Sequence, residues 1–205
     1  LSGVASCPPD QLFSAVGAGL VASGVVTDAA GNSANLSSNP FNIQFAAPTI
    51  TVTLSPAANA NGWNNGPVTA HFVCDENGQP LAGCPADIVT ATEGANLTVS
   101  GSVTDASGVS ASVTSALFNI DLTPPVLTLA APNGASAVFV SPVNLTGSAM
   151  DALAGVDTVT CANAPASLLA ASVACTVALT QGPNSIDAVA TDRAGNTTTL
   201  SLPLQ

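Results

Sequence analysis

The stretch that decides the fold spans residues 97–108 and reads LTVSGSVTDASG. Its first eight residues alternate apolar or small side chains with hydroxyl side chains, which is the two-residue period of a half-buried β-strand. The strand is followed by Thr-Asp-x-x-Gly, in which the aspartate can accept backbone N–H bonds and the glycine can adopt a positive φ. Such strands are typical of antiparallel sheets that pack one face on a core. The stretch therefore predicts a strand of an antiparallel sheet that ends in a capped turn.

The same pattern is part of a repeat. Residues 7–48 align without a gap with residues 84–125, at a constant offset of 77. The matched pairs include Cys7 with Cys84, Val26-Thr27-Asp28 with Val103-Thr104-Asp105, Gly31 with Gly108, and Phe41-Asn42-Ile43 with Phe118-Asn119-Ile120. A third copy of the turn, Thr191–Gly195, lies 87 residues after the second, so the third unit carries ten extra residues after Cys161. A period near 80 is longer than the roughly 20–50 residues of solenoid repeats and favours small independent domains in tandem.

The local pattern is that of strands throughout the chain. Val68, Ala70, Phe72 and Cys74 are expected on one strand face, and Ile186, Ala188 and Ala190 on another. Turn residues recur about every 8–12 positions, which is typical of an all-β sandwich. Only Leu168–Ala171 suggests a helix, of a single turn. We therefore predict an all-β fold of antiparallel β-sandwiches.

Several motifs resemble those of a known family: NGWNNGPVT at 61–69, VTD at 103–105, DLTPP at 121–125 and ATDRAGNT at 190–197. They resemble bacterial immunoglobulin-like repeats, which occur in tandem in large cell-surface and secreted proteins such as adhesins. The third unit is similar to a related Ig-like module that is also an accessory domain of secreted carbohydrate-active enzymes. The resemblance implies tandem Ig-like antiparallel β-sandwiches. We assign residues 1–48 to the C-terminal part of one domain, 49–124 to a complete domain, and 125–205 to a complete domain with an extra disulfide-bridged insertion.

Composition excludes several classes of function. The net charge is −11, and Arg193 is the one basic residue apart from a single histidine. A chain with a single Lys or Arg residue cannot neutralise a row of phosphates, so we expect no nucleic-acid partner. No run of residues approaches the roughly 18 apolar positions of a membrane span, so we expect none.

The five cysteines favour an extracellular location. The resemblance implies a bacterial cell surface or the secreted fraction. Their spacing predicts local bridges between Cys74 and Cys84 and between Cys161 and Cys175, each worth about 2.5–3 kcal/mol in the chain-entropy model. Ala149 stands where the second unit has Cys74, which suggests that the bridge moved with an inserted strand that carries Cys175. The alternative is five free thiols in a cytosolic protein. Cys7 is left without a local partner.

Catalytic signals are weak, and we expect no enzyme and no required cofactor. The single histidine, His71, falls on the polar face of a strand, where a solvated residue is more common than a base. Asp28 and Asp105 are expected to cap their own turns. Trp63 is expected to pack over the end of a small core. The alternative is that its ring stacks on a sugar, which would make the chain a carbohydrate-binding accessory module with cell-surface glycans as partners.

A calcium site is a further prediction. In an Ig-like sandwich, two loops at one pole would carry Asp151, Asp157 and Asp192, and the linker that enters this pole carries Asp121. Like charges that converge raise one another's pKa or require a cation, and Ca²⁺ prefers oxygen ligands of this kind. Arg193 is the only basic residue expected nearby. Interdomain Ca²⁺ is also what the resemblance implies for some arrays.

The favoured function is a non-catalytic structural array that forms an extracellular stalk or surface fibre, with neighbouring Ig-like domains or subunits as partners. The repeat leaves residues 1–48 without counterparts of residues 49–76. Either the chain continues upstream and supplies them, together with a partner for Cys7, or a strand from a neighbouring subunit inserts and the protein is a filament or pilus subunit. In the second case the groove is expected along Leu20, Ala22, Gly24 and Val26.

Overall fold

A computed structural model describes residues 2–132 and 141–205 of the protein. These residues form antiparallel strands and turns and contain no α-helix, which confirms the predicted all-β class. Within this described part, no helix has the length and hydropathy needed to cross a membrane. The chain divides into two compact units, one of Leu1–Thr51, Val73–Pro85 and Ser102–Ser112, the other of Val52–Phe72, Ala86–Gly101 and Val113–Gln205. The predicted domain boundaries at residues 48 and 124 stay a prediction.

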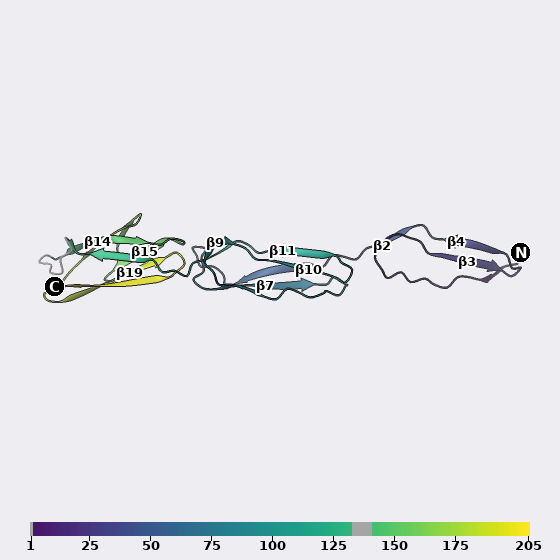
Figure 1. Cartoon of the computed structure of the whole chain (residues 1–205), viewed down its shortest axis with the longest axis horizontal. Helices are drawn as coiled ribbons and strands as arrows, with labels where there is room; N and C mark the ends of the chain where they lie inside the picture. Colours follow the sequence, from purple (N-terminus) through teal and green to yellow (C-terminus); the bar gives the residue numbers. More distant parts are fainter. Residues whose placement is uncertain (1, 133–140) are drawn as a thin grey trace. The chain divides into compact units, whose positions relative to one another are not determined.

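The last strands form a sandwich of two four-stranded sheets, the C-terminal sandwich (Figure 1). The first sheet has the order β13-β14-β18-β17, with bounds Val126–Ala130, Val143–Met150, Ser172–Val177 and Ser167–Leu169. The second has the order β16-β15-β19-β20, with bounds Ala164–Pro165, Val156–Cys161, Asn184–Asp192 and Thr197–Leu204. When the strands are lettered along the chain, these orders are A-B-E-D and C′-C-F-G. They are the two sheets of an immunoglobulin-like fold.

The two sheets enclose an apolar core, and none of the described residues buried in it is aromatic. Val143, Leu145, Val173 and Ala190 are buried at its centre, together with Leu127, Val159, Ile186, Ala188 and Leu204. Ile186, Ala188 and Ala190 share the inner face, as their two-residue spacing predicted. The core is closed by the bridge between Cys161 on β15 and Cys175 on β18, which joins one sheet to the other.

Two expectations for this sandwich need correction. β18 pairs with β14 as β8 pairs with β7 earlier in the chain, so the strand that carries Cys175 is strand E of the lettering above and not an inserted strand. The extra residues instead form β16 and β17. The expected helical turn at Leu168–Ala171 is wrong, because Leu168 pairs with Val173 in the β17–β18 hairpin and Ala170 turns the chain with a φ of 53°.

The middle strands, β6 to β12, use the same pattern with shorter sheets. β6 (Thr49–Ser55), β7 (Val68–Asp75) and β8 (Ile88–Thr90) form one sheet. β10 (Ser100–Thr104) pairs with β11 (Ser110–Thr114), and β9 (Gly94–Leu97) pairs with β12 (Phe118–Ile120). The predicted face of β7 is confirmed by the burial of Val68, Ala70 and Phe72, and the bridge between Cys74 and Cys84 is present with a Cα–Cα distance of 5.8 Å.

The alternating stretch at residues 97–104, predicted as one strand, is divided between two strands, β9 and β10. The ladder is interrupted opposite Ser115, whose hydroxyl accepts the Val99 N–H at 3.0 Å. The Ser115 N–H still bonds the Val99 carbonyl at 2.8 Å, so the hairpin continues past the interruption.

The first strands form two small sheets. β1 (Val4–Ser6), β3 (Ser23–Asp28) and β4 (Ser33–Ser37) make one, and β3 and β4 lie side by side in Figure 1. β2 (Gly17–Leu20) pairs with β5 (Phe41–Ile43) in the other. None of residues 2–47 is buried, although they carry Val, Leu, Ile and Phe side chains. These sheets have one apolar face without a cover among the described residues.

Close approach of β13 and β14 depends on Gly147. A Cβ atom at this position would lie against the carbonyl oxygen of Thr128 on the paired strand. We expect Gly147→Ala to lower the free energy of unfolding by about 1–3 kcal/mol, because the backbone of β13 would have to move. Gly66→Ala is the matched control, since a Cβ there meets no atom within 4 Å, and should change stability by less than about 0.5 kcal/mol. Urea unfolding of both variants checks the prediction, and equal effects would contradict it.

Candidate functional site

Three Asp-x-x-Gly turns close equivalent hairpins, and each aspartate caps its turn. One carboxylate oxygen of Asp28 accepts the N–H groups of Ala30 and Asn32 at 2.9 and 2.8 Å. The glycines Gly31, Gly108 and Gly195 take φ values of 86°, 87° and 98°, a conformation that costs glycine little. The predicted capping role of Asp28 is therefore confirmed.

Asp105 and Asp192 repeat the arrangement. Asp105 Oδ1 accepts the N–H groups of Ser107 and Val109, both at 2.9 Å, so its predicted capping role is confirmed as well. Asp192 Oδ1 accepts the N–H groups of Gly195 and Asn196 at 2.7 and 2.9 Å. Local backbone bonds thus hold one oxygen of each carboxylate.

Whether the second carboxylate oxygen, Oδ2, has a hydrogen-bond donor depends on the side chain four positions after the aspartate. Asn32 donates to Asp28 Oδ2 at 2.9 Å, and Asn196 donates to Asp192 Oδ2 at 2.8 Å. Val109 stands at this position in the middle hairpin and has no donor to offer. Asp105 is 4% exposed, and its Oδ2 is buried without a hydrogen-bond partner. A buried unpaired oxygen costs stability, so the middle turn lacks a stabilising bond that the other two turns have.

The hydrogen bonds within the turns also lower the pKa of the aspartates that accept them. The Asn32 amide, helped by the Ser2 hydroxyl, lowers the pKa of Asp28 to about 2. The Ser107 hydroxyl, 2.6 Å from Asp105 Oδ1, lowers the pKa of that carboxyl, although burial opposes the shift. Hydrogen bonds to the charged form favour that form, so both turns favour ionised aspartate.

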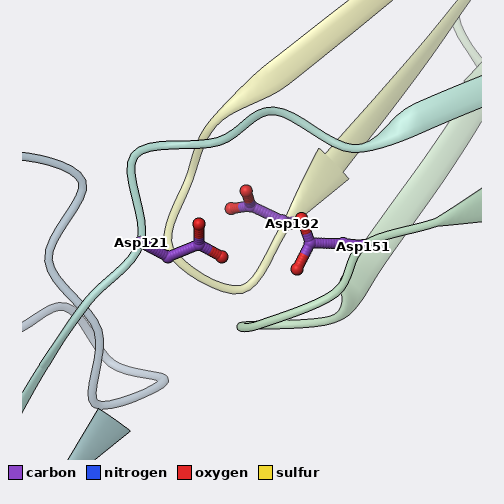
Figure 2. A group of neighbouring side chains, drawn as sticks. All are labelled: Asp121, Asp151 and Asp192. Carbon is purple, nitrogen blue, oxygen red and sulfur yellow. The ribbon is translucent and has the colours of Figure 1, made fainter. Parts of the chain in front are cut away.

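Three carboxylates meet where the linker after β12 enters the C-terminal sandwich. Asp121 lies on the linker, Asp151 follows β14, and Asp192 ends β19 (Figure 2). One ligand atom of each lies within 4.8 Å of the others. Asp121 and Asp192 are fully enclosed, with exposed fractions of 0% and 1%. All three belong to the same compact unit.

Backbone groups already hold these carboxylates in place. Asp121 accepts the Thr123 N–H on Oδ1 at 3.1 Å and the Ala154 N–H on Oδ2 at 2.8 Å. Asp151 Oδ1 accepts the N–H groups of Leu153 and Gly155 at 3.0 and 2.7 Å. A carboxylate oxygen has two lone pairs, so both Asp121 oxygens, Asp151 Oδ2 and Asp192 Oδ2 retain the capacity to ligate a cation.

Electrostatics oppose this arrangement in the absence of a cation. Burial raises the pKa of Asp121, and the neighbouring Asp151 and Asp192 carboxylates raise it further. The only ion pair within the described residues joins His71 to Asp87, far from these residues in sequence. Arg193 is exposed, and its N–H bonds the Gly155 carbonyl at 2.9 Å. The cluster is therefore a hard, all-oxygen donor set of the kind that suits Ca²⁺.

The structure does not bring Asp157 into the cluster. Val156 pairs with Asp192 and Thr158 with Thr191, so the register shifts and Asp157 lies in the resulting bulge. Its side chain is exposed. A bulge changes which side chains point inward, which the simple alternation of the sequence could not reveal. The predicted set of four is therefore reduced to Asp121, Asp151 and Asp192.

The linker is held from its other side by Glu93, which the sequence analysis did not single out. Glu93 Oε1 accepts the Leu122 N–H and the Thr123 hydroxyl, both at 2.7 Å. On the opposite side, Asn196 donates to the Asp121 carbonyl at 2.9 Å. The linker is thus bonded on both sides, and a Glu at this position, 28 residues before an Asp-x-Thr-Pro-Pro linker, gave no local signal of it.

The residues considered for catalysis or sugar binding lie in ordinary structural settings. His71 is exposed on β7, and its Nδ1 lies 2.7 Å from Asp87 Oδ1, which agrees with a solvated strand residue. Trp63 is half-buried, and its backbone N–H donates to Asn59 Oδ1 at 3.1 Å within its own loop. Asn59 also donates to the Arg193 carbonyl at 2.8 Å, so this loop contacts the turn that carries Asp192.

Comparisons with known proteins give structural neighbours only. No protein-family model matches the chain, and no curated protein matches its sequence. One similar solved structure is that of fibronectin(III)-like modules of Clostridium thermocellum CbhA, with 15% identity and a TM-score of 0.37 over 76% of this chain and 93% of that chain. Another is from a 1.5-MDa bacterial ice-binding adhesin, with 16% identity and a TM-score of 0.41 over 90% of this chain and 72% of that chain. The immunoglobulin-like class rests on the strand order described above.

A donor placed opposite Asp105 Oδ2 should repair the middle turn. We expect Val109→Asn to raise the free energy of unfolding by about 1 kcal/mol, because its amide would reproduce the Asn32 and Asn196 bonds. The reciprocal variant, Asn196→Val, should lower it by about 1–3 kcal/mol, since it leaves Asp192 Oδ2 without this donor and also removes the bond to the Asp121 carbonyl. Chemical denaturation of both variants provides the measurement. Destabilisation by Val109→Asn would show that the orphan oxygen is not what weakens this turn.

The first turn should be sensitive to acid. Because the pKa of Asp28 is lowered from 3.8 to about 2, its carboxylate contributes stability that is present above pH 3.8 and lost as the pH falls towards 2. Asn32→Val removes the largest cause of the shift. We expect the variant to raise the Asp28 pKa towards 3.8, as measured by NMR titration of the carboxyl carbon. An unchanged pKa would mean that the Asn32 bond does not control the titration.

Proposed function

We propose that the protein is a non-catalytic structural array of Ig-like modules that forms an extracellular stalk or surface fibre. The observation that carries this proposal is that the linker is hydrogen-bonded on both sides. Glu93 on one side, and Ala154 and Asn196 on the other, hold residues 121–123. A linker with both sides bonded and two prolines at its end restricts bending. Restricted bending is what a stalk requires of its junctions.

The disulfides and the composition support an extracellular position. Both bridges close small sandwiches, which is common in secreted domains with limited cores. Arg193 is the only Lys or Arg in the chain, so proteases that cleave after basic residues have one site. We therefore place the protein on a bacterial surface or in the secreted fraction. The carbohydrate-binding alternative, with Trp63 as its aromatic contact, stays a prediction that a glycan array with Trp63→Ala would test.

Small-angle scattering of the whole chain tests the stalk. We expect the mass of a single chain and an extended profile with little flexibility. Glu93→Ala removes two linker bonds and should increase the flexibility seen in the scattering, whereas Glu76→Ala, which removes an exposed glutamate elsewhere, should not. A flexible wild-type chain, or equal profiles for the two variants, would contradict the stalk.

We further propose that Asp121, Asp151 and Asp192 bind Ca²⁺ and stiffen the entry to the C-terminal sandwich. The specific observation in favour is the complete burial of two carboxylates beside a third. A divalent cation would neutralise the charge that raises the pKa of Asp121. A bound metal would then join the linker, at Asp121, to the two parts of the sandwich that carry Asp151 and Asp192.

The calcium proposal predicts that Asp151→Asn changes the melting temperature relative to the unchanged chain in opposite directions without and with Ca²⁺. In EDTA, Asp151→Asn should raise the melting temperature slightly, because it removes a like charge beside Asp121 and keeps Oδ1 as an acceptor for Leu153 and Gly155. In millimolar Ca²⁺ the unchanged chain should gain several degrees and Asp151→Asn should not. Asp157→Asn is the control outside the cluster and should respond like the unchanged chain. No gain for the unchanged chain in Ca²⁺ would remove the proposal.

A further inference from the structure

The chain contains several Asn-Gly dipeptides, and the structure constrains them to different degrees. Three lie in the described part of the chain, at residues 61–62, 65–66 and 77–78, and a fourth, at 133–134, lies outside it. In such a dipeptide the glycine nitrogen can attack the side-chain carbonyl carbon of the asparagine, because glycine has no side chain to hinder the approach. The two groups must be free to meet, so hydrogen bonds to either of them slow the reaction.

The dipeptide Asn61-Gly62 is bonded at both groups. The Gly62 N–H donates to the Asn59 carbonyl at 2.9 Å, so the attacking nitrogen is engaged. Asn61 Nδ2 donates to the Arg193 carbonyl at 3.3 Å, so the side-chain amide is engaged as well. Both bonds have to break before the two groups can react.

The dipeptide Asn77-Gly78 is bonded through its asparagine. Asn77 Nδ2 donates to the Ala47 carbonyl at 2.8 Å, and the Asn77 N–H donates to Asp75 Oδ1 at 2.9 Å. The side chain must leave the Ala47 carbonyl before its own carbonyl carbon can turn towards the glycine nitrogen. This dipeptide is therefore also restrained, although less than Asn61-Gly62.

The dipeptide Asn65-Gly66 has neither restraint. Among the described residues, the Asn65 side chain and the Gly66 N–H have no hydrogen-bond partner, and Asn65 is exposed. A Cβ built on Gly66 would meet no atom within 4 Å, so the space around it is open. The preceding residue is nevertheless fixed, because Asn64 is buried and its N–H donates to the Asn119 carbonyl at 3.0 Å. The fold thus leaves one dipeptide of an otherwise anchored loop free to react.

This free amide faces a turn of the C-terminal sandwich. A Cβ built on Gly195 would lie 3.6 Å from Asn65 Nδ2. The loop of Asn65 is bonded to the same turn through Asn59, whose Nδ2 donates to the Arg193 carbonyl at 2.8 Å. Loop and turn belong to one compact unit. A charge at position 65 would therefore lie against the turn that Asp192 caps.

We propose that Asn65 is a site of spontaneous deamidation. The Gly66 nitrogen attacks Asn65 Cγ, the bond from Cγ to Nδ2 breaks, and Nδ2 leaves as ammonia with the proton of the Gly66 N–H. The resulting succinimide ring is opened by water at either of its carbonyl carbons, which gives an aspartate or an isoaspartate. The net reaction consumes one water and releases one ammonia, so it needs no oxidant, reductant or enzyme.

Either product replaces a neutral amide by a carboxylate. The loop that holds the Asp192 turn therefore gains negative charge as the protein ages, in a chain whose net charge is already −11. This modification site goes beyond the proposed stalk and does not depend on it.

The test compares the whole folded chain with a peptide of residues 58–69, ANANGWNNGPVT, which contains Asn61 and Asn65 in their own sequence. Both are incubated at mildly alkaline pH, and tandem mass spectrometry locates the mass increase of about 1 Da that accompanies each conversion. We expect the ratio of the Asn65 rate to the Asn61 rate to be about fivefold higher in the folded chain than in the peptide, because only Asn61 must break hydrogen bonds of the fold.

Gly66→Ala is the matched control variant. Its Cβ hinders the attack on Asn65 and meets no atom of the folded chain. We expect this variant to lose most of the conversion at Asn65 and to keep the Asn61 rate of the unchanged protein.

A second readout locates the new charge. The backbone N–H signals of residues 193–196 in NMR spectra should shift as Asn65 converts, and the Gly66→Ala chain incubated in parallel should keep its original signals. A rate ratio no higher than that of the peptide, or conversion at Asn65 without a shift of these signals, would overturn the proposal. Either result leaves the scattering test of the stalk unaffected, because that test depends on Glu93 and the linker at residues 121–123.

Discussion

The structure depends on the requirement that the apolar face of each hairpin be covered. The chain has few aromatic residues, so its sheets must approach closely enough for Val, Leu and Ala side chains to fill the space between them. Within one sheet Gly147 lets β13 and β14 pair closely, and the Cys161–Cys175 bridge joins that sheet to its partner. Where the cover is present, the hairpin residues are fully buried. Where the described residues supply no cover, as over β5, the identical residues Phe41 and Ile43 are half-exposed.

The capped turns of the hairpins have a second role at the entry to the C-terminal sandwich. Three equivalent hairpins have an aspartate at the start of the turn, and its carboxylate bonds the turn backbone, so these bonds need no group from a distant segment. In the C-terminal sandwich the same aspartate also faces the entering linker, and Asn196 joins the two by donating to Asp192 and to the Asp121 carbonyl. The capped turn at Asp192 is thus also part of the contact between the linker and the C-terminal sandwich. This reuse explains why a carboxylate cluster occurs at that pole.

The environment of a carboxylate, rather than its motif, decides its acidity. Asp28 and Asp105 have lowered pKa values because donors in their own turns favour the charged form. Asp121 also accepts two backbone bonds, yet its pKa is raised because it is buried beside two further carboxylates. The two bonds to Asp121 do not lower its pKa below the ordinary value, since burial and neighbouring charge outweigh them at the junction.

The sequence by itself determined the all-β class, the inner faces of β7 and β19, both disulfide pairs and the capping role of the turn aspartates. These features follow from two-residue periodicity, local spacing and bonds within five residues. Only the tertiary structure decided that a bulge excludes Asp157, that Glu93 holds the linker, that residues 168–171 join a hairpin, and that Asp105 Oδ2 lacks a donor. Each of these depends on strand register or on contacts between segments distant in the chain. Local pattern carries no information about such contacts, because pairing partners are chosen by the packing of the whole sandwich.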